Sequence, residues 1–178
     1  MSLKLLLVDR DGVILEHVDP YILNKEDIKF VKGSIDALKA ISDNNIKIAV
    51  ISNQSPVNRK LISHSFVQET NQYIMQSLNL TKNQIRFYYC PHTPDEKCKC
   101  RKPNIEMFKR ACLDFNIPYQ DAYIIGDHDT DMLAGIKFKL TNRIHVLSGR
   151  QKNKSTYATD TCENLFDFAT KYKKIITK

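Results

Sequence analysis

Two carboxylates, Asp9 and Asp11, directly follow the apolar segment "LKLLLV". Residues two apart in an extended segment share a face, so both carboxylates can reach one space. Two carboxylates in one space can hold Mg²⁺, a hard cation that takes oxygen ligands, or divide into a nucleophile and a proton carrier. A polar exit from a strand, with Gly12 in the turn, is the alternative interpretation of this motif by itself.

Three later segments add polar groups of other kinds. The segment "ISNQS" brings Ser52 and Asn53, and "CRKP" places Lys102 just before a helical pattern. A hydroxyl, backbone N–H groups and an ammonium group can bind the oxygens of a phosphoryl group. The segment "IIGDHDTD" supplies Asp127 and Asp131. With the first motif, these residues include the nucleophile, anion ligands, cation and metal ligand that phosphoryl transfer requires.

A cluster of soft ligands lies between these motifs, in "CPHTPDEKCKC" (90–100). Cys90, His92, Cys98 and Cys100 are ligand types that suit tetrahedral Zn²⁺ in a closed structural site, with no open position for a substrate. A hairpin that carries unrelated reduced cysteines is the alternative. We expect zinc to pin the loop, so that removing the metal damages activity indirectly.

These motifs need elements that bring them together, and the sequence alternates between apolar runs and helical patterns. The runs that we interpret as strands cover 3–8, 46–52, 85–89, 122–126 and 143–147. Apolar residues at helical spacing lie within 35–41, 62–78 and 105–115. Near-continuous apolar strands favour a parallel sheet that is covered on both faces. We therefore predict an α/β fold with an open, doubly wound parallel sheet, whose chemistry lies where loops leave the carboxyl ends of the strands.

The length of the chain fits one domain, residues 1–178, and no repeat or linker divides it. The stretch between Asp9 and Ser52 is already filled by a loop and one helix, and the zinc loop (90–100) is short. We therefore expect no separate cap domain and an open site.

The composition indicates a soluble protein with a basic surface. Lys and Arg number 27 against 20 Asp and Glu, a net charge of +7, which favours anionic partners. Part of the excess lies in two runs, 150–154 and 171–174, which we interpret as plain solvated surface. The chain has no long apolar run and no signal-peptide pattern at its start, so we expect a cytoplasmic protein without a membrane partner. We also expect a monomer, with Cys112 and Cys162 as buried thiols.

The motifs "DRDGV", "SNQ", "CRKP" and "GDHDTD" together resemble the four motifs of the haloacid dehalogenase (HAD) superfamily of phosphatases, from about residue 3 to residue 149. More narrowly, "DRDG", "NQS", "CPH" and "CRKP" resemble the group of histidinol-phosphate and heptose-bisphosphate phosphatases. This resemblance implies a Rossmann-like HAD core and Mg²⁺ as a cofactor. In that group a loop like 90–100 binds zinc and shapes the pocket beside the Arg-Lys pair, here Arg101 and Lys102.

The resemblance also implies a role for each acidic motif residue. Asp9 would be the nucleophile that forms an aspartyl-phosphate, and Asp11 the acid that protonates the leaving alcohol and then activates water. Asp9, the backbone carbonyl of Asp11, and Asp127 would hold Mg²⁺. Asp131 would support Lys102 or the metal shell.

The same resemblance assigns the phosphate and substrate ligands. Ser52 and Lys102 would bind the phosphoryl oxygens, with Asn53 in support. Arg59 resembles a basic residue that follows "NQS" in heptose-bisphosphate phosphatases, and with Arg101 it could bind a second anionic group or a substrate hydroxyl. A solvated arginine is the alternative for Arg59.

Two residues depart from the heptose-type pattern. Pro56 and His128 stand where a glycine and a lysine are usual. Proline removes a backbone donor, and histidine is mostly neutral at pH 7. We expect both near the rim of the pocket, where they bear on the substrate more than on the reaction.

We therefore predict a Mg²⁺-dependent phosphomonoesterase for a small sugar phosphate, first of all the 7-phosphate of D-glycero-D-manno-heptose 1,7-bisphosphate. Histidinol phosphate is the second candidate substrate. A nucleic-acid 3′-phosphatase is the third possibility, because polynucleotide kinase 3′-phosphatases have similar motifs. The sequence has no clear basic stripe with stacking aromatics, however, and the zinc loop fits that group badly, so we do not expect a nucleic-acid partner. The fourth is a non-catalytic binding protein, against which stands the presence of Asp9, Asp11, Lys102 and Asp127.

Overall fold

One sheet of six parallel strands organises residues 3–177, the part of the chain that the computed structural model describes. Its strand order is β3-β2-β1-β4-β5-β6, and every neighbouring pair is parallel. The strands are β1 (Leu5–Val8), β2 (Lys47–Asn53), β3 (Ile85–Cys90), β4 (Ala122–Gly126), β5 (Asn142–Val146) and β6 (Asp160–Cys162). From β1 the sheet is built outward to one side through β2 and β3 and to the other side through β4, β5 and β6. The boundary between β1 and β4 is therefore the switch point of a doubly wound sheet.

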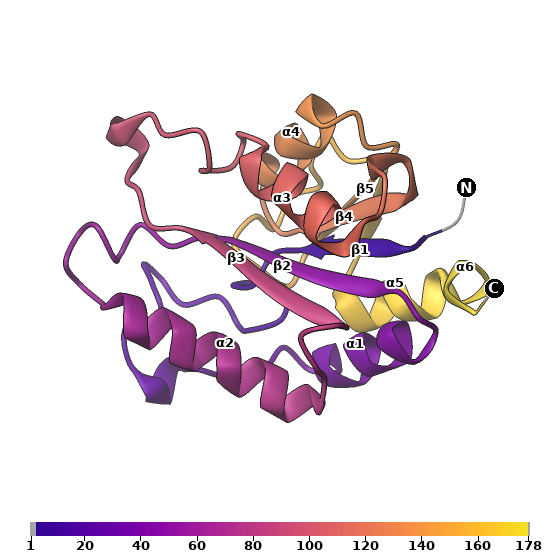
Figure 1. The fold of residues 1–178 in the computed structure, drawn as a ribbon, viewed down its shortest axis with the longest axis horizontal. Coiled ribbons are helices and arrows are strands. Elements are labelled where there is room, and N and C mark those ends of the chain that lie inside the picture. Colours follow the sequence, from indigo (N-terminus) through magenta and orange to yellow (C-terminus); the bar gives the residue numbers. More distant parts are fainter. Residues whose placement is uncertain (1–2, 178) are drawn as a thin grey trace.

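Helices cover both faces of the sheet (Figure 1). One face is covered by α1 (Ser34–Asp43), α2 (His64–Leu78) and α5 (Leu165–Lys171), with α6 (Lys173–Ile176) following α5. The other face is covered by α3 (Glu106–Phe115) and α4 (Asp129–Lys137). The predicted α/β architecture is confirmed.

The central strand β1 shows how alternating side chains build two cores. Leu6 and Val8 pack among residues of α1, α2 and α5, whereas Leu5 and Leu7 pack on the opposite side with Phe108 of α3. All four strand residues are fully buried. A strand that is covered on both faces has no polar side to present, which is why its sequence is continuously apolar.

Five of the six strands were predicted, with ends that differ from the observed ones by at most two residues. The strand β6 was not, because it is short and contains the polar residues Asp160 and Thr161. The helix expected over 62–78 begins at His64, because Ser63 caps it: the Ser63 hydroxyl accepts a hydrogen bond from the Phe66 N–H at 3.0 Å.

The carboxyl ends of β1, β2, β3 and β4 meet at one edge of the sheet, and the chain leaves each of them in a loop. Within residues 3–177 no separate cap domain is inserted between these loops, as predicted. The described helices include none with the length and apolarity needed to span a membrane.

Candidate active site

A cleft of about 200 Å³ lies at this edge of the sheet. Five loops contribute to its lining. They bring Asp9 after β1, Gln54 after β2, Lys102 before α3, Asp127 after β4 and Arg150 after β5. The motifs that lie far apart in the sequence therefore share one space.

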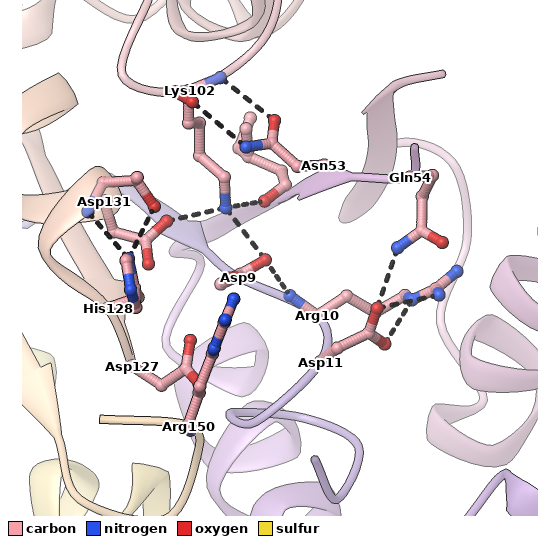
Figure 2. Close-up of polar contacts among 12 residues, drawn as sticks. Asp9, Arg10, Asp11, Asn53, Gln54, Lys102, Asp127, His128, Asp131 and Arg150 are labelled. Atoms are coloured by element: carbon pink, nitrogen blue, oxygen red, sulfur yellow. Dashed lines mark hydrogen bonds and ion pairs between the residues drawn. The ribbon is translucent and has the colours of Figure 1, made fainter. Parts of the chain in front are cut away.

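The Lys102 ammonium group lies on the floor of the cleft with three partners (Figure 2). Its Nζ is 2.6 Å from Asp131 Oδ1 and 2.9 Å from Asp9 Oδ1, and it donates a hydrogen bond to the Ile51 carbonyl at 2.7 Å. Lys102 is 2% exposed. Burial lowers the pKa of Lys102, but the two carboxylates outweigh burial and raise this pKa above its ordinary value. The lysine therefore carries its charge at neutral pH.

Three carboxylates, those of Asp9, Asp127 and Asp131, have oxygens within 4.8 Å of one another. Burial raises the pKa of Asp9 to about 7 against the opposing charge of Lys102, and the Asp131 charge adds to the rise. Burial, together with the Asp9 charge, also raises the pKa of Asp127 to about 7. A divalent cation would relieve this repulsion, and oxygen is the ligand atom that Mg²⁺ prefers. The cluster therefore fits Mg²⁺.

Asp127 reaches the cleft between two close backbone segments. The N–H of Arg150 donates a hydrogen bond to Asp127 Oδ2 at 2.6 Å. A Cβ on either Gly12 or Gly149 would collide with the Asp127 carboxylate, and Gly12 also has a φ of +90°. Glycine is therefore required at these positions if the carboxylate is to stay where it is.

The Asp11 carboxylate has partners of its own. Arg10 Nε and Nη2 donate hydrogen bonds to Asp11 Oδ1 and Oδ2, at 2.8 and 3.0 Å, and Gln54 Nε2 donates to Oδ2 at 2.8 Å. Burial raises the pKa of Asp11, but Arg10 and Gln54 more than offset burial, so that this pKa lies below its ordinary value. The two carboxylates of the first motif thus have opposite environments, since the pKa of Asp9 is raised.

Lys102 is joined to the end of β2 by a reciprocal pair of hydrogen bonds (Figure 2). The Lys102 N–H donates to Asn53 Oδ1 at 3.0 Å, and Asn53 Nδ2 donates to the Lys102 carbonyl at 3.1 Å. The neighbouring Arg101 lines the cleft and donates from Nη1 to the His92 carbonyl at 3.1 Å. The arginine and lysine are therefore fixed from two sides, by β2 and by the loop after β3.

The side chains of Cys90, His92, Cys98 and Cys100 gather where β3 ends. Cys100 Sγ is 3.2 Å from Cys90 Sγ and 3.5 Å from Cys98 Sγ, and His92 Nδ1 is 3.4 Å from Cys90 Sγ and 3.3 Å from Cys100 Sγ. Zinc–sulfur bonds of about 2.3 Å in a tetrahedron place two sulfurs ~3.8 Å apart. The three thiols are free of disulfides. The cluster is thus slightly tighter than a zinc tetrahedron and fits one such ion.

Two predicted ligands lie outside the lining of the cleft. Ser52 is 3% exposed within β2, and from this strand the lining begins at Asn53. Arg59 is exposed and lies outside the lining. The roles assigned to Ser52 and Arg59 stay predictions. Pro56 and His128, the two departures from the heptose-type pattern, do line the cleft.

Three further residues at this site received no role from the sequence. Arg150, which we expected to be plain solvated surface, is exposed but lines the cleft. Arg10 and Gln54 bind Asp11. Both belong to the motifs "DRDG" and "NQS", but no role was predicted for either. A guanidinium group between two carboxylates was the available signal for Arg10. The Gln54 contact joins two loops, and no local pattern indicates it.

Comparisons with known proteins identify the family to which this chain is similar. A family model described as polynucleotide kinase 3 phosphatase matches residues 4–130, and one described as HAD-hydrolase-like matches residues 99–167. The D-glycero-beta-D-manno-heptose-1,7-bisphosphate 7-phosphatase of Helicobacter pylori is 35% identical over 152 residues, which are 84% of this chain and 87% of that relative. The phosphatase of the same name from Haemophilus ducreyi is 31% identical over 84% of this chain and 86% of its own length.

Solved structures share the fold. A D,D-heptose 1,7-bisphosphate phosphatase from B. bronchiseptica, complexed with magnesium and phosphate, superposes with a TM-score of 0.86 and 21% identity, covering 97% of this chain and 99% of that one. The corresponding phosphatase from Burkholderia thailandensis gives a TM-score of 0.69 and 22% identity, with 96% and 98% covered.

Proposed function

The chain belongs to the haloacid dehalogenase-like phosphatases, and from this premise we propose that it removes the 7-phosphate of D-glycero-D-manno-heptose 1,7-bisphosphate. Two relatives that match most of the chain are named for that activity. The observation that carries the proposal is the buried Lys102 ammonium group between Asp9 and Asp131, because Asp9, the proposed nucleophile, lies beside a cation at the floor of a cleft. We also propose a cytoplasmic location, which is compatible with the free cysteine thiols.

In the proposed reaction, a carboxylate oxygen of Asp9 attacks phosphorus, and the bond from phosphorus to the sugar oxygen breaks. Asp11 gives a proton to the leaving oxygen, which requires that the negative charge of the bound phosphoryl group raise the pKa of Asp11 above its low value in the free protein. Water then attacks the aspartyl-phosphate, Asp11 takes a proton from that water, and the bond to Asp9 breaks to release inorganic phosphate. Lys102 balances the charge on the phosphoryl oxygens, with Asn53 holding its backbone and Ser52 as a further proposed ligand.

The proposed Mg²⁺ ligands are Asp9, Asp127 and the backbone carbonyl of Asp11, while Asp131 orients Lys102. When bound, Mg²⁺ supplies positive charge beside the transferring phosphoryl group. The magnesium and phosphate in the similar B. bronchiseptica structure support this assignment.

We further propose that Cys90, His92, Cys98 and Cys100 hold Zn²⁺ and that this site is structural. The distances among the four ligand atoms support a closed tetrahedral site. Arg101 follows the last of these ligands directly and is the proposed contact to the rest of the substrate.

Phosphate release from heptose 1,7-bisphosphate in the presence of Mg²⁺ tests the proposal. Asp9→Asn should lower the rate at least about a thousandfold, because the amide cannot form the aspartyl-phosphate. Asp95→Asn is the matched control, since Asp95 is exposed in the zinc loop and lies outside the cleft lining, and it should retain the native rate.

Parallel assays with histidinol phosphate and a 3′-phosphorylated oligonucleotide decide between substrates. The family model for residues 4–130 favours the oligonucleotide as the second candidate. Faster release from either alternative would replace heptose bisphosphate as the substrate. An Asp9→Asn protein that keeps native turnover would remove Asp9 from the reaction.

A further inference from the structure

Arg10 is a charged residue buried in the middle of the first motif, with 1% of its surface exposed. Figure 2 shows its side chain extending alongside Asp11, away from Lys102. The guanidinium plane meets the carboxylate with two hydrogen bonds, from Nε to Oδ1 and from Nη2 to Oδ2. This paired geometry fixes orientation as well as distance, which a single ammonium group cannot do.

Two further contacts hold this pair in place. Gln54 Nε2 donates to Asp11 Oδ2 at 2.8 Å, and the Gln54 N–H donates to the Cys90 carbonyl at 2.7 Å. On the other side, Arg10 Nη1 donates to Asn71 Oδ1 in α2 at 3.4 Å. Gln54, directly after β2, therefore binds Asp11 while its own backbone binds the first residue of the cysteine cluster, and Asn71 of α2 supports Asp11 indirectly through Arg10.

The number of donors limits what Asp11 can do. A carboxylate offers about four acceptor positions on its two oxygens. Arg10 and Gln54 occupy three of them. One position is left for exchanging a proton with a leaving oxygen or with water, and its direction is set by the three contacts.

We propose that Arg10 and Gln54 are positioning residues that direct the one remaining acceptor position of Asp11 toward the leaving oxygen of the substrate. This inference rests on the phosphatase reaction proposed above, but not on heptose bisphosphate as the substrate. The step that it affects transfers a proton from Asp11 to the leaving oxygen as the bond from phosphorus to that oxygen breaks. The proton is regained from water when the aspartyl-phosphate is hydrolysed.

The dependence on the leaving group separates this role from a general structural one. An alkyl phosphate must release an alkoxide unless a proton is supplied, so its cleavage needs a correctly directed Asp11. p-Nitrophenyl phosphate releases a stable phenolate and needs no proton in that step. A misdirected Asp11 therefore slows cleavage of the alkyl ester selectively, whereas a distorted cleft slows both.

The experiment compares two variants with a matched control. Arg10→Lys keeps the charge but removes the paired contact, and Gln54→Ala removes one donor while keeping its backbone N–H. Arg143→Lys is the same substitution at an arginine that binds the carbonyls of Tyr157 and Leu140 and lies outside the cleft lining. Single-turnover cleavage of glycerol 2-phosphate and the p-nitrophenolate burst are measured by rapid quench with Mg²⁺ present.

Arg10→Lys and Gln54→Ala should each slow glycerol 2-phosphate cleavage by about 10- to 100-fold and the p-nitrophenolate burst by less than about threefold. The KM values should change little, and Arg143→Lys should leave the ratio of the two rates at its native value. If Arg10→Lys does not fold, Gln54→Ala decides.

Equal losses on both esters, or no loss on the alkyl ester, would overturn the positioning role. Native protein that cleaves both esters but not heptose bisphosphate would overturn only the proposed substrate. Native protein that releases phosphate from neither ester nor heptose bisphosphate would overturn the proposed reaction and the positioning role together.

Discussion

Asp9 and Asp11 stand two apart in the sequence, but their surroundings prepare them for different tasks. Burial and nearby carboxylates raise the pKa of Asp9, whereas the Arg10 pair and Gln54 keep the pKa of Asp11 low in spite of burial. A bound cation would therefore increase the ionised fraction of Asp9, the proposed nucleophile, whereas the charge of Asp11 is already balanced within the protein. Identical side chains acquire separate roles from their neighbours.

The raised pKa values predict how the metal-free protein responds to pH. The pKa values of Asp9 and Asp127 rise from 3.8 to about 7 on folding, so their contribution to stability is complete below about pH 4 and is lost as the pH rises through 7. Burial lowers the pKa values of His128 and His145, so the contribution of these two residues to stability increases as the pH rises.

The comparison with Asp127→Asn isolates the carboxylate. In a chelator, the difference between the unfolding temperatures of native protein and variant should decrease as the pH is raised from about 5 to about 8. Added Mg²⁺ should abolish this pH dependence of the difference. Mg²⁺ affinity should rise over the same interval, because the ligands bind it in ionised form. A relative unfolding temperature that climbs with pH would contradict the raised pKa of Asp127.

At the scale of elements, the segment between β3 and α3 joins the cysteine cluster to the floor of the cleft. Arg101 binds the carbonyl of His92, a member of the cluster, and Lys102 follows it directly. The short 3-10 helix Pro94–Glu96 completes the loop. The position of the Lys102 ammonium group therefore depends on the shape of this loop.

Removal of one thiol tests that dependence. Cys98→Ser should reduce bound zinc from about one per chain to near zero. It should also lower kcat/KM by about 10-fold or more, because Lys102 remains present but loses the loop that holds it in position. Cys112→Ser is the matched control, because Cys112 lies in α3 outside the cluster, and it should keep both zinc and activity. Elemental analysis that finds full zinc in Cys98→Ser would contradict the four-ligand site.

At the scale of the whole molecule, β1 is packed into both cores and pairs with β2 and β4, so it lies beneath three of the loops that line the cleft. Leu7→Ala should lower the free energy of unfolding by about 2–5 kcal/mol, because Leu7 is fully buried and leaves a cavity. Leu113→Ala should change it by less than about 0.5 kcal/mol, since Leu113 is 75% exposed. Chemical denaturation measures both, and similar values for the two variants would contradict this distribution of packing.

Much of this architecture could be predicted because the central strands are covered on both faces. Continuous apolar runs mark β1, β2 and β4, and parallel strands necessarily bring Asp9 and Asp127 to one edge. The strand β6 lies at the margin of the sheet, where polar residues such as Asp160 are tolerated, so its sequence has no comparable signal.

Contacts between loops were beyond sequence reasoning. Gln54 reaches Asp11 and Arg150 enters the cleft lining only because particular loop conformations place them there. Arg59, for which the family resemblance implied a ligand role, is exposed and lies outside the lining of the cleft, so its role stays a prediction.

The crowded ammonium group of Lys102 links two sites in the cleft thermodynamically. It is ion-paired with Asp9 and Asp131 and donates a hydrogen bond to the Ile51 carbonyl. A phosphoryl oxygen that binds this ammonium group must compete with these three groups. A cation that engages Asp9 weakens one competitor, so metal and phosphate must raise each other's affinity by the same factor. If Lys102 and Asp9 act as proposed, heterotropic cooperativity follows from one lysine, and phosphate should bind more weakly without the metal than with it.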